Sequence, residues 1–188
     1  DSPVLPIVEE LTTVLEPVEA LRRFAGWPDV VLFESALRRE RLGRYSFLTA
    51  DPFHTFHMQR ATYGSDPFRD VREVFKHCVA ETLPELPPFQ GGVAGLLGYE
   101  LGHAFERLPR SGIDDFKLPD LMLGVYDWVI AWDHVQQRAW LISHGFPETD
   151  PVRRSDRAAR RAASVRKCLD GAVETVPAQT VAKRPVAQ

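Results

Sequence analysis

The chain has 188 residues, of which 44% are hydrophobic and 26% are charged, and its formal net charge is −3. This composition is typical of a soluble globular protein with one domain, or with one domain and a tail. The weak negative charge offers no overall attraction to nucleic acid or to an anionic membrane surface, and no run reaches the roughly 18 apolar residues that a membrane-spanning helix needs.

The first third of the chain predicts a helix followed by three strands. Pro17 suits the first turn of a helix, and Gly26 with Pro28 ends it. The β-branched and aromatic run VVLFES predicts a strand, and RYSFLTA predicts a second one. Apolar and polar residues alternate in FHTFHMQR, as they do in a half-exposed strand. The predicted ranges are 17–25 for the helix and 30–35, 44–50 and 53–60 for the strands.

The middle of the chain predicts a helix that begins near Asp66, which can cap it, with Pro67 in its first position. Apolar residues then recur at the i, i+3, i+4 spacing of a helix face that is turned toward a core. They are Phe68, Val71, Val74, Phe75, Cys78 and Val79. An extended linker over 83–88 leads to the glycine-rich stretch FQGGVAGLLGYELGHAFERLP at 89–109.

The last part of the chain predicts a hairpin with long arms, because apolar runs flank the turn-like DHVQQ in LMLGVYDWVIAWDHVQQRAWLIS. Residues 153–170 are rich in Arg and Ala and predict a surface helix with a weak apolar face, formed by Ala158, Ala162, Val165 and Leu169. Residues 174–188 show no periodicity and predict a tail or linker. Mixed helices and strands with a hairpin predict the α+β class, with a largely antiparallel sheet and packed helices.

The glycine-rich stretch raises the question of a phosphate-binding loop, because such loops often precede helices. Its glycines lack the G-x-G-x-x-G spacing of a dinucleotide site, and Gly98 is followed by Tyr99 and Glu100 instead of the Lys and Ser/Thr of a P-loop. No Lys or Arg lies within the loop to neutralise phosphate. We therefore interpret the stretch as a packing element: a buried strand joined tightly to a helix over 99–108, with glycines where a neighbour comes close.

No catalytic or metal site is evident from the residue spacings. His54 and His57 are three residues apart on a predicted strand, so their side chains point to opposite faces. His103 and Glu106 share a helical face but have no third ligand at a suitable spacing.

The two cysteines, Cys78 and Cys168, are far apart and match no metal or redox spacing. Reduced thiols are the simpler interpretation. The N-terminal residues lack the basic and apolar regions of a signal peptide, so a cytoplasmic location is expected.

One pair of strand ends carries groups that suit an amino-acid ligand. Glu34 and Ser35 end one predicted strand, and Arg44, Tyr45 and Ser46 begin the next, so antiparallel pairing brings them together. An acid, a hydroxyl and an aromatic surface can hold the ammonium group and the ring of an amino acid. Cross-strand pairing of surface groups, without any ligand, explains the same residues equally well.

Five segments resemble, in the right order, the N-terminal region of the chorismate-utilising synthases. This family includes component I of aminodeoxychorismate synthase and component I of anthranilate synthase. The segments are VVLFESA, LGRYSFLTADPF, FQGGVAGLLGYELGHAFERLP, LPDLMLGVYDWVIAWDH and AWLIS, and the resemblance covers residues 17–145. GLLGYELGHAFERLP and LGVYDWVIAWDH look more like the aminodeoxychorismate branch, which serves para-aminobenzoate and folate synthesis.

The resemblance implies an N-terminal α+β domain over 1–148, followed by a charged helix and linker over 149–188 that lead to a catalytic domain absent from this chain. In the family, that C-terminal domain binds chorismate and Mg²⁺, so the resemblance implies no catalytic residue, metal or cofactor in this chain. The implied partners are the C-terminal chorismate-binding domain and a glutamine amidotransferase subunit that supplies ammonia. The implied reaction of the full-length enzyme converts chorismate to 4-amino-4-deoxychorismate.

The resemblance further implies a pocket of the kind that binds tryptophan in this family. In anthranilate synthases the pocket is a feedback site, and in some aminodeoxychorismate synthases it holds tryptophan without regulating. The matching residues are Leu32, Phe33, Glu34 and Ser35 for the family's LLES element and Arg44, Tyr45 and Ser46 for a second element. Phe33 stands where the family pattern has Leu, which changes the shape of the pocket.

Two alternatives stay open at this point. The chain fits the tryptophan-feedback domain of an anthranilate synthase component I, and it also fits a stand-alone binding or interaction module without catalysis. Either one is compatible with an α+β domain that has no metal or catalytic motif of its own.

Overall fold

The computed structural model describes residues 5–37, 42–109 and 115–171, which form two antiparallel sheets and four helical segments. The first sheet has the strand order β1-β8-β7-β3-β2 and the second has the order β4-β6-β5. The strands are β1 (Ile7–Glu10), β2 (Val31–Phe33), β3 (Tyr45–Thr49), β4 (His54–Met58), β5 (Gly92–Leu97), β6 (Leu121–Tyr126), β7 (Trp128–Asp133) and β8 (Arg138–Ser143). The helices are α1 (Pro17–Arg23), α2 (Arg69–Phe75) and α3 (Pro151–Asp170), with a 3₁₀ helix at Tyr99–Ala104. The α+β class and the antiparallel pairing predicted from the sequence are confirmed.

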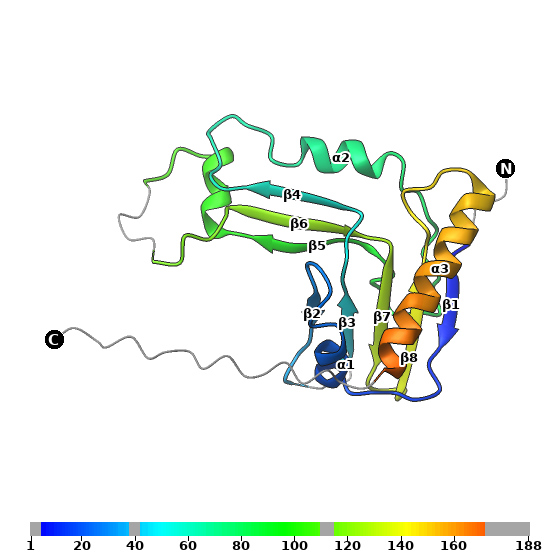
Figure 1. Cartoon of the computed structure of the whole chain (residues 1–188). Helices are drawn as coiled ribbons and strands as arrows, with labels where there is room; N and C mark the ends of the chain where they lie inside the picture. The colour runs from blue at the N-terminus through cyan, green and yellow to red at the C-terminus, as the bar shows by residue number, and fades with distance from the viewer. Residues whose placement is uncertain (1–4, 38–41, 110–114, 172–188) are drawn as a thin grey trace.

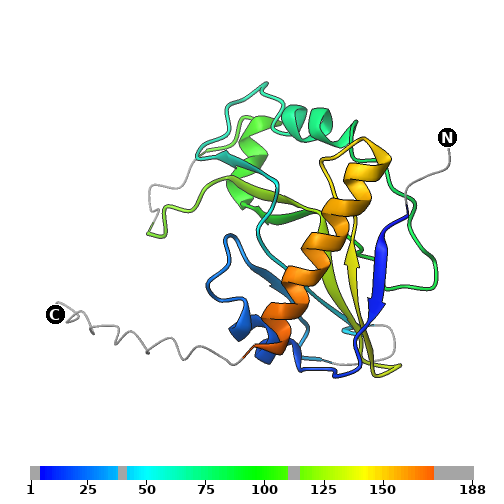
Figure 2. The same ribbon diagram turned by 45° about the vertical axis from the view of Figure 1, so that its right-hand side comes forward.

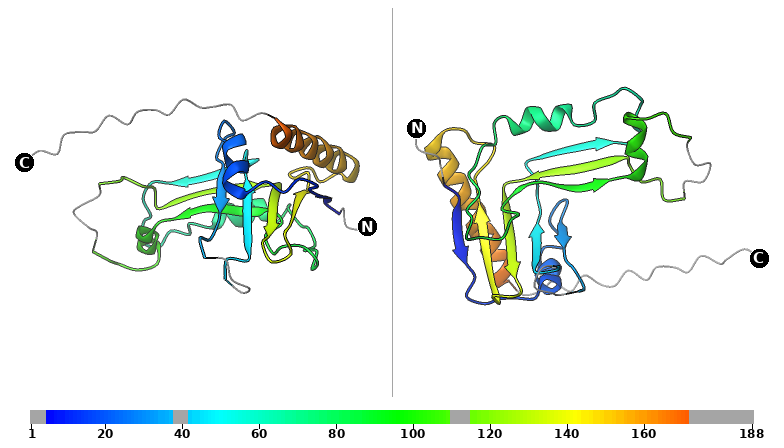
Figure 3. Two further views of the ribbon diagram at one scale, coloured as in Figure 1. Left: turned by 90° about the horizontal axis from the view of Figure 1, so that it is seen from below. Right: turned by 180° about the vertical axis from the view of Figure 1, so that it is seen from behind.

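The two sheets lie crosswise, with β4, β5 and β6 extending away from the end of the five-stranded sheet (Figure 1). The helix α3 lies along one face of the five-stranded sheet (Figure 2). Two further views place α2 along the three-stranded sheet and the 3₁₀ helix at the far end of that sheet (Figure 3). Each sheet is therefore covered by its own helices.

The central strands β7 and β8 of the five-stranded sheet are buried on both faces. On one face, Leu48, Trp128 and Ile130 pack with α1 and α3. On the other, Val129 and Trp140 belong to a second cluster. Because both faces of β7 are covered, all six of its residues are buried, and apolar and polar residues do not alternate along it. The hairpin of β7 and β8 confirms the turn predicted at DHVQQ.

A smaller core holds the three-stranded sheet against α2 and the 3₁₀ helix. Leu121 and Leu123 of β6 pack with Leu101 and Ala104 of the 3₁₀ helix and with Ala61. None of the residues of α2 is itself buried, although Val71 packs against this cluster. The predicted core-facing helix is therefore shorter and more peripheral than its apolar spacing indicates.

The N-terminal helix closely matches its prediction, whereas the strand β1 was not predicted. Pro17 lies in the first turn of α1, and Phe24 at its end is fully buried. The strand β1 contains only IVEE and pairs in antiparallel register with β8, where Ile7 lies opposite Ser143. A run of four residues is too short to show a period, so only its distant partner defines it.

The glycine-rich stretch is confirmed as a packing element at Gly95, but its strand is not buried. Gly95 has φ +152°, and a Cβ there would lie 2.2 Å from the carbonyl oxygen of Met122. The strand β5 lies at the edge of its sheet, where Leu97 is 54% exposed. The following helix is 3₁₀ and ends at Ala104, so the predicted buried strand and the helix to residue 108 are wrong in those respects.

The long first arm of the predicted hairpin is two strands in different sheets. The strands β6 and β7 are separated by a single residue, Asp127, at which the chain passes from the three-stranded to the five-stranded sheet. Asp127 is fully buried, and the Nε atoms of Arg157 and Arg161 of α3 lie 3.5 and 3.4 Å from its carboxylate oxygens. This corner of the fold is thus tied to α3 by charge.

The helix α3 is part of the main core. Asp150 accepts a hydrogen bond from the Arg153 amide at 3.0 Å and caps the helix, and Pro151 follows in the first turn. The predicted apolar residues Ala158, Ala162, Val165 and Leu169 are all buried. The helical part of 149–188 therefore packs on the sheet without a break in the core at 148, while the predicted tail or linker over 174–188 lies outside the described residues.

Candidate functional site

The residues predicted to form an amino-acid pocket lie on or beside the adjacent strands β2 and β3. The strands are antiparallel, with Leu32 opposite Leu48 and Phe33 opposite Phe47. Because successive side chains of a strand point to opposite faces, these residues divide into two groups. Leu32 packs against the core under α1 and α3, whereas Phe33 contacts an aromatic cluster on the other face.

The aromatic cluster beside Phe33 offers a surface for a flat ring. The Phe33 ring lies edge-on to Phe89 with centroids 6.5 Å apart, and Phe47 lies edge-on to the same ring at 5.6 Å. Tyr45 lies 6.2 Å from Phe47. Phe33 is 44% exposed, so part of this surface remains accessible. Phe47 and Phe89 are additions that sequence reasoning did not place at the site, because only the strand register and the path of the linker bring them there.

Arg44 forms an ion pair with Asp133 at the end of the neighbouring strand β7. Its Nη2 lies 2.6 Å from Oδ2 of Asp133, and its Nε donates to both carboxylate oxygens. Burial disfavours the ionised form of Asp133, but hydrogen bonds from Arg44 and from the amides of Gln136 and Val135 outweigh it, so its pKa lies below the ordinary value. The arginine also lies over the Tyr45 ring at 4.9 Å. The bidentate pair fixes the end of the β3–β7 ladder.

The hydroxyl and acid groups of the predicted site differ in their surroundings. The Ser46 hydroxyl is buried and lies 2.7 Å from Nε2 of His134. The Ser35 hydroxyl donates to the Leu37 carbonyl oxygen at 3.4 Å, and Glu34 is exposed. The strands β2 and β3 are adjacent, but the predicted residues divide between two faces, and Ser46 and Arg44 already have partners at His134 and Asp133.

Within the described ranges, no group of three or more His, Cys, Asp or Glu side chains is arranged to hold a metal ion. His54 and His57 are both exposed on β4. Among the same residues, no helix combines the length and the apolar character that crossing a bilayer requires.

No family model matches the chain. Its sequence is similar to aminodeoxychorismate synthase component 1 of Escherichia coli K12, with 32% identity over 134 residues that cover 65% of this chain and 30% of the relative. The corresponding Bacillus subtilis protein is 34% identical over 125 residues, which cover 61% of this chain and 26% of the relative. Anthranilate synthase component 1 of Thermus thermophilus is 29% identical over 176 residues, which cover 89% of this chain and 36% of the relative.

The fold is similar to the crystal structure of anthranilate synthase component I from Streptococcus pneumoniae TIGR4. The TM-score is 0.53 at 20% identity, over 88% of this chain and 37% of that one. The chain thus spans about a third of the length of these relatives. Similar sequences and a shared fold over most of the chain lead to one conclusion: the chain is homologous to the component I proteins of aminodeoxychorismate and anthranilate synthases over about a third of their length.

Proposed function

We propose that this chain is the N-terminal, non-catalytic part of an aminodeoxychorismate synthase component I. The observation that carries the proposal is sequence identity: 32–34% to the aminodeoxychorismate relatives of E. coli and B. subtilis, against 28–29% to the anthranilate relatives. A segment of 61 residues is 51% identical to the Salmonella typhimurium aminodeoxychorismate protein. The full-length enzyme aminates chorismate to 4-amino-4-deoxychorismate for folate synthesis.

The remaining two thirds of the enzyme supply the chemistry in this proposal. The chain covers 30% of the E. coli relative, which leaves room for a chorismate-binding domain. Mg²⁺ and chorismate belong to that C-terminal domain, which packs on this one. The relatives are named component 1, which supports a second component as partner, and we assign that role to a glutamine amidotransferase. A cytoplasmic location stays a prediction.

We further propose that Leu32, Phe33, Glu34, Ser35, Arg44, Tyr45 and Ser46 border an amino-acid pocket whose other wall is the C-terminal domain. The accessible aromatic surface of Phe33, Phe47 and Phe89 supports a ring-shaped occupant. The engagement of Arg44 with Asp133 argues that this arginine shapes the pocket and does not itself hold the ligand.

The second candidate is the tryptophan-feedback domain of an anthranilate synthase component I. Its support is coverage: the T. thermophilus protein matches 89% of this chain, against 65% for the E. coli aminodeoxychorismate protein. The third candidate is a stand-alone binding or interaction module without catalysis.

The coding sequence downstream of Gln188 tests the proposal against the module. We expect the reading frame to continue for some 250 codons, about the length of a second domain. A stop codon directly after residue 188 in the natural gene would contradict the proposal and favour the module. Identification of the product formed by the full-length protein then separates the two synthases.

A further inference from the structure

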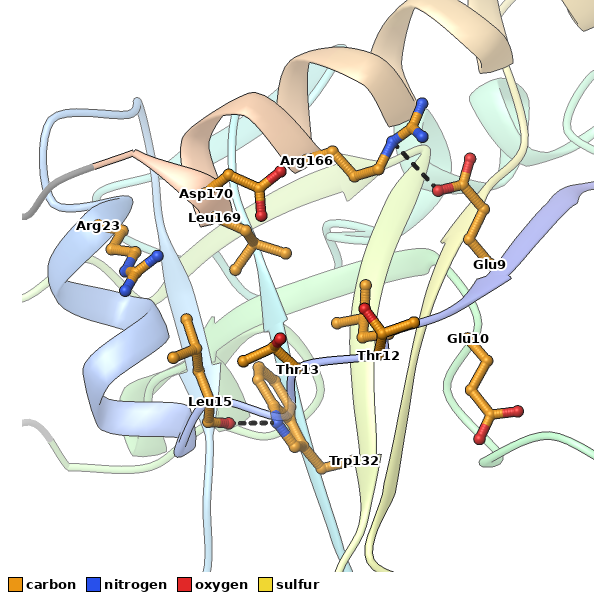
Figure 4. A pocket seen from close by; sticks show the side chains of 11 residues that line it. Glu9, Glu10, Thr12, Thr13, Leu15, Arg23, Trp132, Arg166, Leu169 and Asp170 are labelled. Carbon is orange, nitrogen blue, oxygen red and sulfur yellow. Dashed lines mark hydrogen bonds and ion pairs between the residues drawn. The ribbon is translucent and has the colours of Figure 1, made fainter.

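A cavity of about 450 Å³ lies where the C-terminal ends of α1 and α3 approach the loop that follows β1 (Figure 4). Its size falls within the range of small-molecule sites. The two helix ends adjoin, since the Cys168 thiol donates to the Arg23 carbonyl oxygen at 3.1 Å. The lining residues are Glu9, Glu10, Leu11, Thr12, Thr13, Leu15, Arg23, Trp132, Arg166, Leu169 and Asp170. None of the seven residues of the predicted amino-acid pocket is among them.

The floor of the cavity is apolar and firmly held. Trp132 is 2% exposed, and its indole N–H donates to the Leu15 carbonyl oxygen at 2.8 Å, which anchors the loop (Figure 4). Leu169 at the end of α3 is 7% exposed, and Leu15 packs against the same core. The hydroxyls of Thr12 and Thr13 lie on the exposed loop. The cavity therefore combines a rigid apolar surface with nearby hydrogen-bonding groups.

Most charges on the wall are already paired. The Arg166 Nε lies 3.2 Å from Glu9 (Figure 4), and Glu10 is bridged at 2.6 Å by Arg138. Such exposed pairs need no ligand to neutralise them.

Arg23 is the exception among the arginines of the wall. Its side chain is only 17% exposed, and its sole ion pair among the described residues is to Glu19 at 3.8 Å, one helical turn away. Its Nε is shielded from water and has no hydrogen-bond partner within those residues. A guanidinium that is largely removed from water attracts an anion that can accept its hydrogen bonds.

We propose that this cavity binds a small organic monocarboxylate. The carboxylate lies against the guanidinium of Arg23, and the apolar body packs on Leu15, Leu169 and the edge of Trp132. The carboxylate of Asp170 on the wall disfavours a second negative charge, which selects against phosphate and dicarboxylates. The site shares no residue with the predicted amino-acid pocket, and the proposal does not depend on which synthase the full-length protein is.

Benzoate is the probe, with neutral benzamide as its isosteric control, added to the 188-residue chain. The readout is the NMR signal of the Trp132 indole N–H, which reports on the floor. We expect benzoate to shift it saturably and to bind about tenfold or more tightly than benzamide, because one charge-assisted contact is lost in the amide. Equal binding of the two, or no shift of this signal with benzoate, overturns the proposal.

Substitutions locate the charge that is responsible. Arg23→Gln should weaken benzoate binding about tenfold or more, whereas Arg22→Gln, on the exposed neighbour outside the cavity, should leave it within about twofold. An equal loss in both variants indicates non-specific charge attraction and overturns the proposal.

Two further variants keep the test decisive if Arg23→Gln fails to fold. Asp170→Asn removes a repulsive charge from the rim and should tighten benzoate binding roughly two- to fivefold. Thr13→Phe, on the exposed loop, should fill the cavity and abolish binding. Unchanged affinity in both variants contradicts a carboxylate site here.

Discussion

At the scale of single residues, Asp127 is a buried charge at the corner of the fold. Burial raises the pKa of its carboxyl above the ordinary value of 3.8, although Arg161 and Arg157 oppose this. Neither carboxylate oxygen has a hydrogen bond within the described residues, so the arginines hold it by charge at more than 3 Å. The carboxylate therefore joins the two sheets to α3 without compensating fully for its own burial.

The raised pKa of Asp127 predicts a dependence of stability on pH. The native state binds this proton more tightly than the unfolded state. The contribution of Asp127 to the free energy of unfolding therefore grows as pH falls toward 3.8, and it is lost as pH rises through the raised native pKa. We expect the free energy of unfolding of the wild type, relative to Asp127→Asn, to increase between about pH 7 and about pH 4 in urea titrations. Asp156→Asn on the exposed side of α3 is the control for losing a carboxylate. If the free energy of unfolding of the wild type, relative to that of Asp127→Asn, falls on acidification, the raised pKa is contradicted.

Gly95 predicts a packing cost that is specific to its position. Gly95→Val places a side chain against the Met122 carbonyl at a φ that L residues rarely adopt, so we expect a loss of about 1–3 kcal/mol or more in the free energy of unfolding. Gly26→Val is the control, because nothing lies within 4 Å of a Cβ at Gly26. Thermal melts of the two variants make the comparison. A Gly95→Val protein that melts like the parent would show that the close approach to β6 is not a constraint.

The aromatic surface at Phe33 predicts weak binding of tryptophan by this chain alone. In the proposed pocket the other wall is a C-terminal domain outside residues 1–188, and Arg44 is held by Asp133. Calorimetry with tryptophan should therefore show no binding tighter than about millimolar, which corresponds to roughly −4 kcal/mol. A micromolar dissociation constant contradicts a pocket shared between two domains.

At the scale of elements, α3 predicts a contrast between two valines of one helix. Val165 is fully buried against the five-stranded sheet, whereas Val152 is 69% exposed. Val165→Ala should lower the free energy of unfolding by about 1–3 kcal/mol through lost burial and a residual cavity. Val152→Ala should change it by less than about 0.5 kcal/mol. Equal effects in denaturant titrations contradict the docking of α3 on the sheet.

Some of the helices and strands could be predicted from the sequence, and others could not. Strong local signals predicted α1, the β7–β8 hairpin and the apolar side of α3, because proline at a helix start and runs of β-branched residues act locally. The strand β1 and the change of sheet at Asp127 depend on distant partners and leave no period in the sequence. The apolar spacing of α2 is real, yet an edge position leaves all of its residues unburied.

The candidate site shows the same division. The antiparallel pairing of β2 with β3, which places Phe33 opposite Phe47, is a pairing of neighbouring strands that the sequence predicts. The contact of Phe33 with Phe89 could not be predicted, because β3, β4 and α2 lie between the two rings along the chain. The partner of Arg44, Asp133, likewise comes from a strand that is distant in sequence.

At the scale of the whole molecule, the described residues form a packed unit with three hydrophobic clusters and its own covering helices. It spans about a third of its relatives. The relatives that it matches are named as component 1 of a synthase.

Product identification with the full-length protein tests the central claim most directly. The protein encoded by the complete reading frame is incubated with chorismate, Mg²⁺ and ammonia, and the products are separated by chromatography and identified by mass spectrometry. Protein without Mg²⁺ is the control. We predict 4-amino-4-deoxychorismate without release of pyruvate; formation of anthranilate with pyruvate, or no conversion of chorismate, contradicts the assignment.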